Sequence, residues 1–112
     1  MSDAPINLSK EIDGLRREFA EKLVERRARM EALVASIAGG EDADAVGRAI
    51  DELEELAHNL SGSGALFGYA ELGAAAGDLE AACAQARAAA PVSAGHALAA
   101  SWQAFTAAAD AA

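Results

Sequence analysis

Apolar residues recur along the chain at steps of three and four, which is the spacing of one face of an α-helix. The pattern predicts four helices, over about residues 8–38, 43–67, 70–89 and 93–109. Gly39 and Gly40 end the first helix, and Pro91 ends the third. No segment alternates with a period of two, so we expect no strands.

Each predicted helix carries one apolar face. The first comprises Leu8, Ile12, Leu15, Phe19, Leu23, Met30, Leu33, Val34 and Ile37. The second comprises Val46, Ile50, Leu53, Ala57, Leu60 and Gly64, and the third comprises Leu72, Ala76, Leu79, Cys83 and Ala86. The fourth comprises Leu98, Trp102, Phe105 and Ala109. Four such helices with short connections predict an all-α fold, an antiparallel up-down-up-down four-helix bundle, as a single domain over residues 1–112.

Residues at the expected helix ends indicate how the helices begin and stop. Asp42 or Asp44 is a candidate N-cap for the second helix. Gly68 suits the left-handed position that follows a helix, and Ser93 is a candidate N-cap for the fourth. We expect the alanine-rich tail, residues 105–112, to fray.

Composition and charge exclude several classes of function. The net charge of −9 argues against a nucleic-acid partner, because neutralising phosphates needs a basic patch. The one basic cluster, Arg26, Arg27 and Arg29, is interleaved with Glu25 and Glu31, which is typical of a solvated helix face. No histidine or cysteine pair has metal-ligand spacing, so we expect no metal site.

Cysteine usage and the N-terminus bear on location. Cys83 is the only cysteine and cannot form an internal disulfide, which favours a reducing compartment. The first residues have no signal-peptide pattern, and no stretch has the length of an uncharged membrane span. We therefore expect a soluble, cytoplasmic monomer that does not use a membrane as a partner.

The stretch "HNLSGSGALFG" places one histidine before four small residues. Glycine in a helix interior costs about 1 kcal/mol relative to alanine, so Gly62 and Gly64 break a local rule in the way that functional sites often do. At 100° per residue, His58 lies roughly 120° from the centre of the apolar face, on the flank of its helix. Gly62 lies one turn later and opens space beside the imidazole, whereas Gly64 lies on the apolar face and lets a neighbouring helix approach.

The segment Ala57–Glu80 resembles the signature of histidine-containing phosphotransfer (HPt) domains, and it is closest to the phosphotransfer domain of chemotaxis-type histidine kinases. The matching positions are His58, Leu60, Gly62, Ser63, Gly64, Phe67, Gly68, Leu72, Leu79 and Glu80. The segment covers about a fifth of the chain. The four-helix layout predicted above agrees with the fold of that family.

The resemblance implies a phosphocarrier of a two-component phosphorelay, without catalytic activity of its own. His58 would be the phosphoacceptor, receiving the group from a sensor or hybrid histidine kinase or its receiver. It would pass the group to the aspartate of a response-regulator receiver. Glu80 matches the position that hydrogen-bonds the imidazole Nδ1 in chemotaxis-type relatives; without the resemblance it reads as a solvated surface residue. No cofactor is implied in this chain, and Mg²⁺ is expected on the partner receiver.

Two positions depart from the family pattern. The lysine usual three residues after the histidine is Ser61 here, which offers the phosphoryl oxygens one neutral hydrogen bond and no charge. The second histidine of chemotaxis-type relatives is replaced by Gly77, and His96 on the fourth helix reads as a surface residue. The missing lysine motivates an alternative, a non-phosphorylated interaction module that binds a receiver or kinase and modulates signalling. A plain helical adaptor is a third hypothesis, against which Gly62 argues, because alanine there would stabilise a purely structural bundle.

Overall fold

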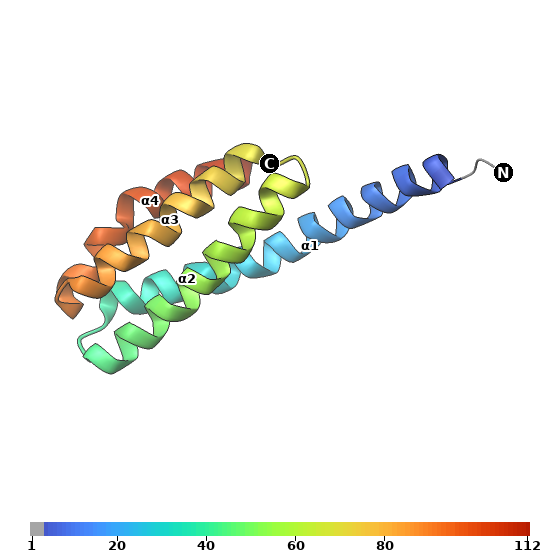
Figure 1. Ribbon diagram of the computed structural model, residues 1–112. Coiled ribbons are helices and arrows are strands. Elements are labelled where there is room, and N and C mark those ends of the chain that lie inside the picture. The colour runs from blue at the N-terminus through green and yellow to red at the C-terminus, as the bar shows by residue number, and fades with distance from the viewer. Residues whose placement is uncertain (1–3) are drawn as a thin grey trace.

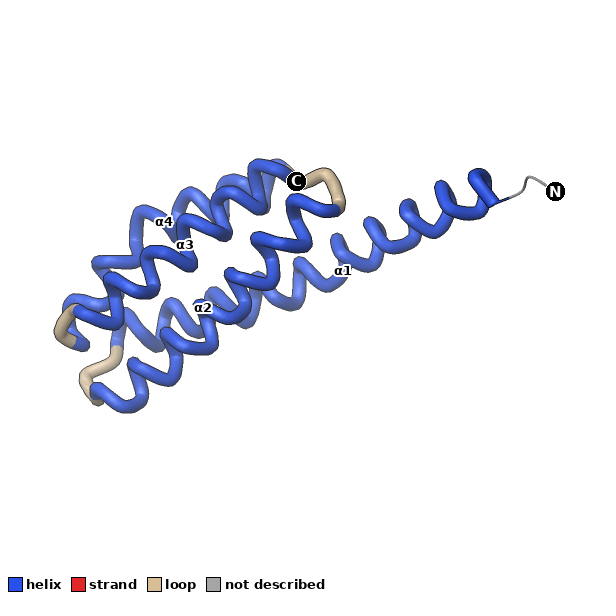
Figure 2. Tube along the Cα trace, viewed as in Figure 1, coloured by secondary structure: helices blue, strands red, loops and turns tan. Residues whose placement is uncertain are grey.

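The computed structural model describes residues 4–112, with side chains from Leu8 onward. It contains four helices: α1 (Ala4–Gly39), α2 (Ala43–Leu66), α3 (Ala70–Ala88) and α4 (Pro91–Ala111). Consecutive helices run in opposite directions and are joined by short loops (Figure 1 and Figure 2). No strand occurs among the described residues, and the predicted all-α antiparallel bundle is confirmed.

The helix ends follow the local sequence with one exception. The carboxylate of Asp42 caps α2 by accepting a hydrogen bond from the backbone N–H of Asp44 at 3.2 Å. Gly68 has a φ of 88°, which glycine adopts without strain, and it turns the chain from α2 into α3. The prediction that Ser93 caps α4 is wrong. Pro91 begins that helix, because its fixed φ and missing N–H suit the first helical position, and Ser93 lies inside the first turn.

The C-terminal tail is helical to Ala111, so the prediction that it frays is also wrong. Phe105 is fully buried and stacks on Trp102 with 5.6 Å between ring centroids. Further along α4, Asp110 forms an ion pair with Arg27 of α1. A buried aromatic ring and a tie to the neighbouring helix therefore hold the last turns in place.

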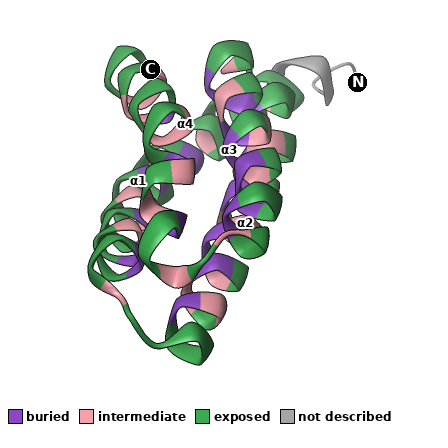
Figure 3. Ribbon diagram, turned by 90° about the vertical axis from the view of Figure 1, so that its left-hand side faces the viewer, coloured by how far each residue is buried: buried purple, intermediate pink, exposed green. Residues whose placement is uncertain are grey.

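The core forms where the apolar faces of the four helices meet. Figure 3 shows the buried positions facing the inside of the bundle and the exposed positions on the outside. The apolar faces predicted for α2 and α3 are buried at every position. On α4, Leu98 and Phe105 are buried, while Trp102 and Ala109 pack against the core at its edge.

The apolar face of α1 is buried only from Phe19 onward. Leu8, Ile12 and Leu15 are 56%, 45% and 47% exposed. They lie on the part of α1 that projects past the other three helices (Figure 1), in a molecule with extents of 62 × 20 × 20 Å. The reason is length, because α1 has 36 residues whereas α2, its longest neighbour, has 24.

Two glycines allow α2 and α3 to approach closely. A Cβ atom on Gly64 would lie 3.1 Å from the Cα of Gly73, and one on Gly73 would lie 3.0 Å from the carbonyl oxygen of Ser61. Both distances are shorter than ordinary contacts with backbone atoms, so a larger residue at either position would require the facing helix to shift. The predicted packing role of Gly64 is confirmed. The contact also brings α3 close to the flank of α2 that carries His58.

Candidate functional site

His58 lies on the flank of α2 that faces α3. Ala57, one residue before His58, and Leu60, two residues after it, are fully buried, and this fixes how α2 is rotated about its axis. The rotation directs His58 outward, and its side chain is 70% exposed. The predicted flank position of this histidine is therefore confirmed.

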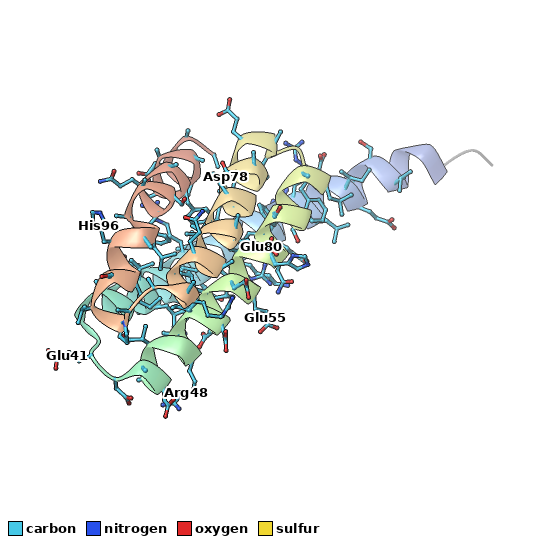
Figure 4. All side chains as sticks on the ribbon, turned by 60° about the vertical axis from the view of Figure 1, so that its left-hand side comes forward. Glu41, Arg48, Glu55, Asp78, Glu80 and His96 are labelled. Atoms are coloured by element: carbon cyan, nitrogen blue, oxygen red, sulfur yellow. The ribbon has the colours of Figure 1, made fainter. Side chains whose placement is uncertain are left out.

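Glu80 reaches His58 from α3. Its Oε2 lies 2.9 Å from Nδ1 of the imidazole, and the neighbouring Leu79 is fully buried, which anchors this turn of α3 in the core. Figure 4 shows Glu80 at the side of α3 that adjoins α2. An ionised carboxylate only accepts hydrogen bonds, so Nδ1 is the donor in this pair. In the neutral ring the lone pair is then on Nε2, the nitrogen that does not face Glu80.

Arg87 of α3 also contacts α2, at carboxylates that precede His58 in the sequence. Its guanidinium donates hydrogen bonds to the carboxylates of Glu54 at 2.9 Å and Asp51 at 2.8 Å. These hydrogen bonds raise the pKa of Arg87. The charge of Arg87 is thus shared between two carboxylates one to two turns before His58, and it helps to hold α3 beside α2.

Ser61 and Gly62 occupy the turn that follows His58. Ser61 is half-buried and faces α3, where a Cβ atom on Gly77 would lie 3.3 Å from its Oγ. A Cβ atom on Gly62 would meet no atom of the described residues within 4 Å. Packing within this part of the chain therefore does not require a glycine at position 62, and the space beside it is open.

The other histidine and the cysteine of the chain do not contribute to the pair formed by His58 and Glu80. Cys83 is fully buried, and burial, followed by the nearby charge of Glu54, raises the pKa of its thiol to about 11. It is therefore a neutral core side chain at physiological pH. His96 is exposed on α4, on a different side of the bundle from Glu80 (Figure 4).

Among residues 4–112, no three side chains of histidine, cysteine, aspartate or glutamate gather in a way that would hold a metal ion. None of the helices described has the length and apolar character needed to cross a membrane.

Two contributors to the site were not singled out from the sequence. Gly73 sets the distance between α2 and α3, and Arg87 ties them together. In the sequence, Gly73 is visible only as a small residue next to Leu72, and Arg87 only as an arginine near a helix end. Neither signal names its partner, because both contacts join residues far apart in the chain.

An exposed histidine on the flank of a four-helix bundle is the arrangement of histidine phosphotransfer domains, and the carboxylate contact from the adjacent helix is the one expected from the resemblance to chemotaxis-type relatives. The model of the Hpt domain family matches residues 14–112, and the chain belongs to this family. No match is found among curated proteins or among solved structures. Hpt domains are phosphocarriers rather than catalysts, and as a family they interact with receiver domains and histidine kinases. The chain therefore has a histidine phosphotransfer role in two-component signalling.

Proposed function

We propose that this Hpt domain carries a phosphoryl group on Nε2 of His58. The group comes from a sensor or hybrid histidine kinase, or its receiver, and leaves for the aspartate of a response-regulator receiver. The observation that carries the proposal is the 2.9 Å contact between Nδ1 of His58 and Oε2 of Glu80, on an imidazole that is otherwise exposed. It leaves the nucleophilic nitrogen facing solvent, where a partner can approach.

The transfer needs no proton to leave the ring. Nε2 attacks the phosphorus of an aspartyl phosphate in line, an N–P bond forms, and the P–O bond breaks with its electron pair going to the aspartate carboxylate. The phosphorylated ring is then cationic, and the carboxylate of Glu80 stabilises it through the Nδ1–H. In the onward step a receiver carboxylate attacks the phosphorus, and the electron pair of the N–P bond returns to Nε2.

Catalysis of such a transfer consists mostly of positioning and charge stabilisation. Ser61 offers one hydroxyl to the phosphoryl oxygens, and the open space at Gly62 gives the partner access. Arg87 is occupied by Glu54 and Asp51. The proposal therefore assigns most of the positive charge to the partner receiver, whose acidic pocket is expected to hold Mg²⁺, and requires no cofactor in this chain.

The acceptor is tested by incubating the chain with phosphorylated receiver domains and measuring its intact mass. We expect the parent and a His96→Gln variant to gain one phosphoryl group that is lost in acid and stable in base. A His58→Gln variant should gain none. Phosphorylation of His58→Gln at the parent rate would contradict the assignment.

The replacement of the usual lysine by Ser61 is the observation that favours the alternative, a non-phosphorylated interaction module. The two functions differ in one outcome. Binding to a receiver that is unchanged in His58→Ala, with no phosphoryl gain from any receiver or kinase, would replace the carrier by the module. The cytoplasmic location expected from the sequence stays a prediction.

A further inference from the structure

The projecting part of α1, residues 8–18, is called the arm here. Leu8, Ile12 and Leu15 lie at steps of four and three, and Phe19 continues the same face into the core. The base of the arm is fixed, because Phe19 stacks on Tyr69 at 5.2 Å and the guanidinium of Arg16 lies 5.9 Å from the centroid of the same ring. The arm is thus a helix held in a defined direction with a coiled-coil face that no other described helix covers.

The apolar side chains of the arm are about half exposed to water, so a second helix that covers them would stabilise the arm by burying apolar surface. The charges of the arm favour another copy of this chain as the source of that helix. The arm has three cations and three anions: Lys10, Arg16 and Arg17 against Glu11, Asp13 and Glu18. Its net charge is therefore zero, whereas the whole chain carries −9. A contact made through two neutral arms therefore adds no net repulsion between the contacting surfaces.

The direction of the exposed face decides how a second copy fits. The arm projects past the end of the bundle that holds the α2–α3 turn and the C-terminal end of α4 (Figure 1). Its exposed face continues that of Phe19, which is buried in the core, so this face lies on the side of α1 against which the other helices pack. That end of the bundle has a hollow of about 310 Å³, lined in part by Tyr69, Glu71 and Ala108. A second copy in parallel orientation would place its bundle where the first bundle stands. An antiparallel copy places its bundle at the far end of the pair, and its arm reaches this end of the first bundle.

We propose that two copies of the chain pair through their arms in antiparallel orientation. Leu8 of one copy then lies near Leu15 of the other, and the two Ile12 side chains lie near the two-fold axis. Each copy uses the same surface, as a closed symmetric dimer requires. The contact rests on three half-exposed side chains and one end of the bundle, which is the character of a small and weak interface. The pairing is therefore a concentration-dependent equilibrium, and it revises the monomer expected from the sequence.

The oligomeric state of the full chain tests the pairing directly. In sedimentation experiments over a wide range of concentration, the average mass of the parent should rise from that of one chain toward that of two. Ile12→Glu, which places two like charges at the centre of the pair, should weaken association at least about tenfold. Val24→Glu is the matched control, since Val24 is exposed on α1 outside the apolar face, and it should associate like the parent.

Two results would overturn the pairing. One is that the parent chain stays monomeric at every concentration. This result would overturn the pairing even if variants in the arm lost affinity for a receiver, because the arm would then bind the receiver and not a second copy. The other is an Ile12→Glu variant, helical by circular dichroism, that associates like the parent. Neither result bears on phosphorylation of His58, so this inference and the proposed function fail separately.

The orientation is tested by disulfide cross-linking in a Cys83→Ala background. A mixture of Leu8→Cys and Leu15→Cys chains should cross-link as heterodimers, because antiparallel pairing brings these positions within disulfide reach. Leu8→Cys alone should remain uncross-linked, and its efficient self-cross-linking would overturn the antiparallel arrangement. Added salt should strengthen the dimer, because it screens repulsion between two chains of charge −9. Weakening by salt would contradict the charge argument.

Discussion

A single proton decides what His58 can do. With the proton on Nδ1 and Glu80 as its acceptor, Nε2 has a free lone pair, which in the proposed function attacks phosphorus. The proposal gives Glu80 two separable effects on this ring. Glu80 would hold the reactive tautomer before transfer, and its negative charge would stabilise the cationic ring afterwards.

Substitutions at Glu80 separate these two effects. Gln at this position keeps an acceptor but loses the charge, and Ala loses both, so transfer should slow in the order parent, Glu80→Gln, Glu80→Ala. A loss of about 1.4 kcal/mol for this partly exposed hydrogen bond predicts about tenfold slower transfer in Glu80→Ala. Rapid-quench measurement with one phosphorylated receiver gives the rates. Asp78→Asn, on the same helix, is the control, and equal rates in parent and Glu80→Ala would refute the role of Glu80.

Because Ser61 has no charge where relatives have lysine, a second substitution can be predicted. Ser61→Lys places a cation one turn from His58, where Coulomb attraction of about 1 kcal/mol near the surface should stabilise the phosphorylated form. The equilibrium between phosphorylated receiver and phosphorylated chain should shift about fivefold toward the chain. Ser63→Lys is the control, because Ser63 lines a hollow between α1 and α2 on the other side of the helix. An equal shift in both variants would show a general effect of added charge.

The packing of α2 against α3 sets the distance between His58 and Glu80. Gly64 and Gly73 let α2 and α3 approach, and this approach brings Glu80 within reach of His58. Gly62 is on the same helix as Gly64 but faces open space. The two kinds of glycine predict opposite effects of the same added methyl group.

Gly73→Ala should destabilise the bundle by about 1–3 kcal/mol, because the new Cβ would overpack against backbone atoms. Gly62→Ala should stabilise it by about 0.5–1 kcal/mol, the difference in helix propensity, and slow transfer several-fold by filling the open space next to His58. Urea unfolding and transfer rates of the two variants check both effects. If Gly62→Ala is more stable and transfers at the parent rate, Gly62 has no role in access.

The buried thiol of α3 predicts a pH dependence of stability. The pKa of Cys83 is raised from 9.0 to about 11, so the folded state resists ionisation that the unfolded state allows. Its contribution is complete below about pH 9 and is lost as the pH rises toward 11, by up to about 2–3 kcal/mol. The free energy of unfolding should therefore fall more steeply in the parent than in Cys83→Val over this interval. Parallel pH profiles would contradict this.

Periodicity and end signals predict the helices well, because both are encoded in neighbouring residues. The buried faces of α2 and α3, the cap at Asp42 and the turn at Gly68 all follow from such local patterns. Ser93 failed as a cap because Pro91 occupies the first helical position. The contact between His58 and Glu80 came from a family motif, whereas no motif covered the contacts of Gly73 and Arg87.

For the whole molecule, the relative lengths of the helices decide how much of each apolar face is buried, which the spacing of apolar residues does not reveal. Leu8 and Phe19 belong to the same face of α1, yet only Phe19 is buried, because the other helices end before they reach Leu8. A row of apolar residues in the sequence therefore indicates which face of a helix can be buried. The lengths of the neighbouring helices decide whether the same chain covers that face. This is why the arm emerges from the structure and not from the sequence.

We propose that the bundle holds Nδ1 of His58 against Glu80 so that the phosphoryl group is carried on Nε2. The most direct test is NMR of the ¹⁵N-histidine-labelled chain after phosphorylation by a receiver, with the phosphorus–nitrogen coupling assigned to one ring nitrogen. We expect phosphorus on Nε2 of His58, with the proton retained on Nδ1. Phosphorus on Nδ1, or on His96, would contradict the proposed role of this nitrogen.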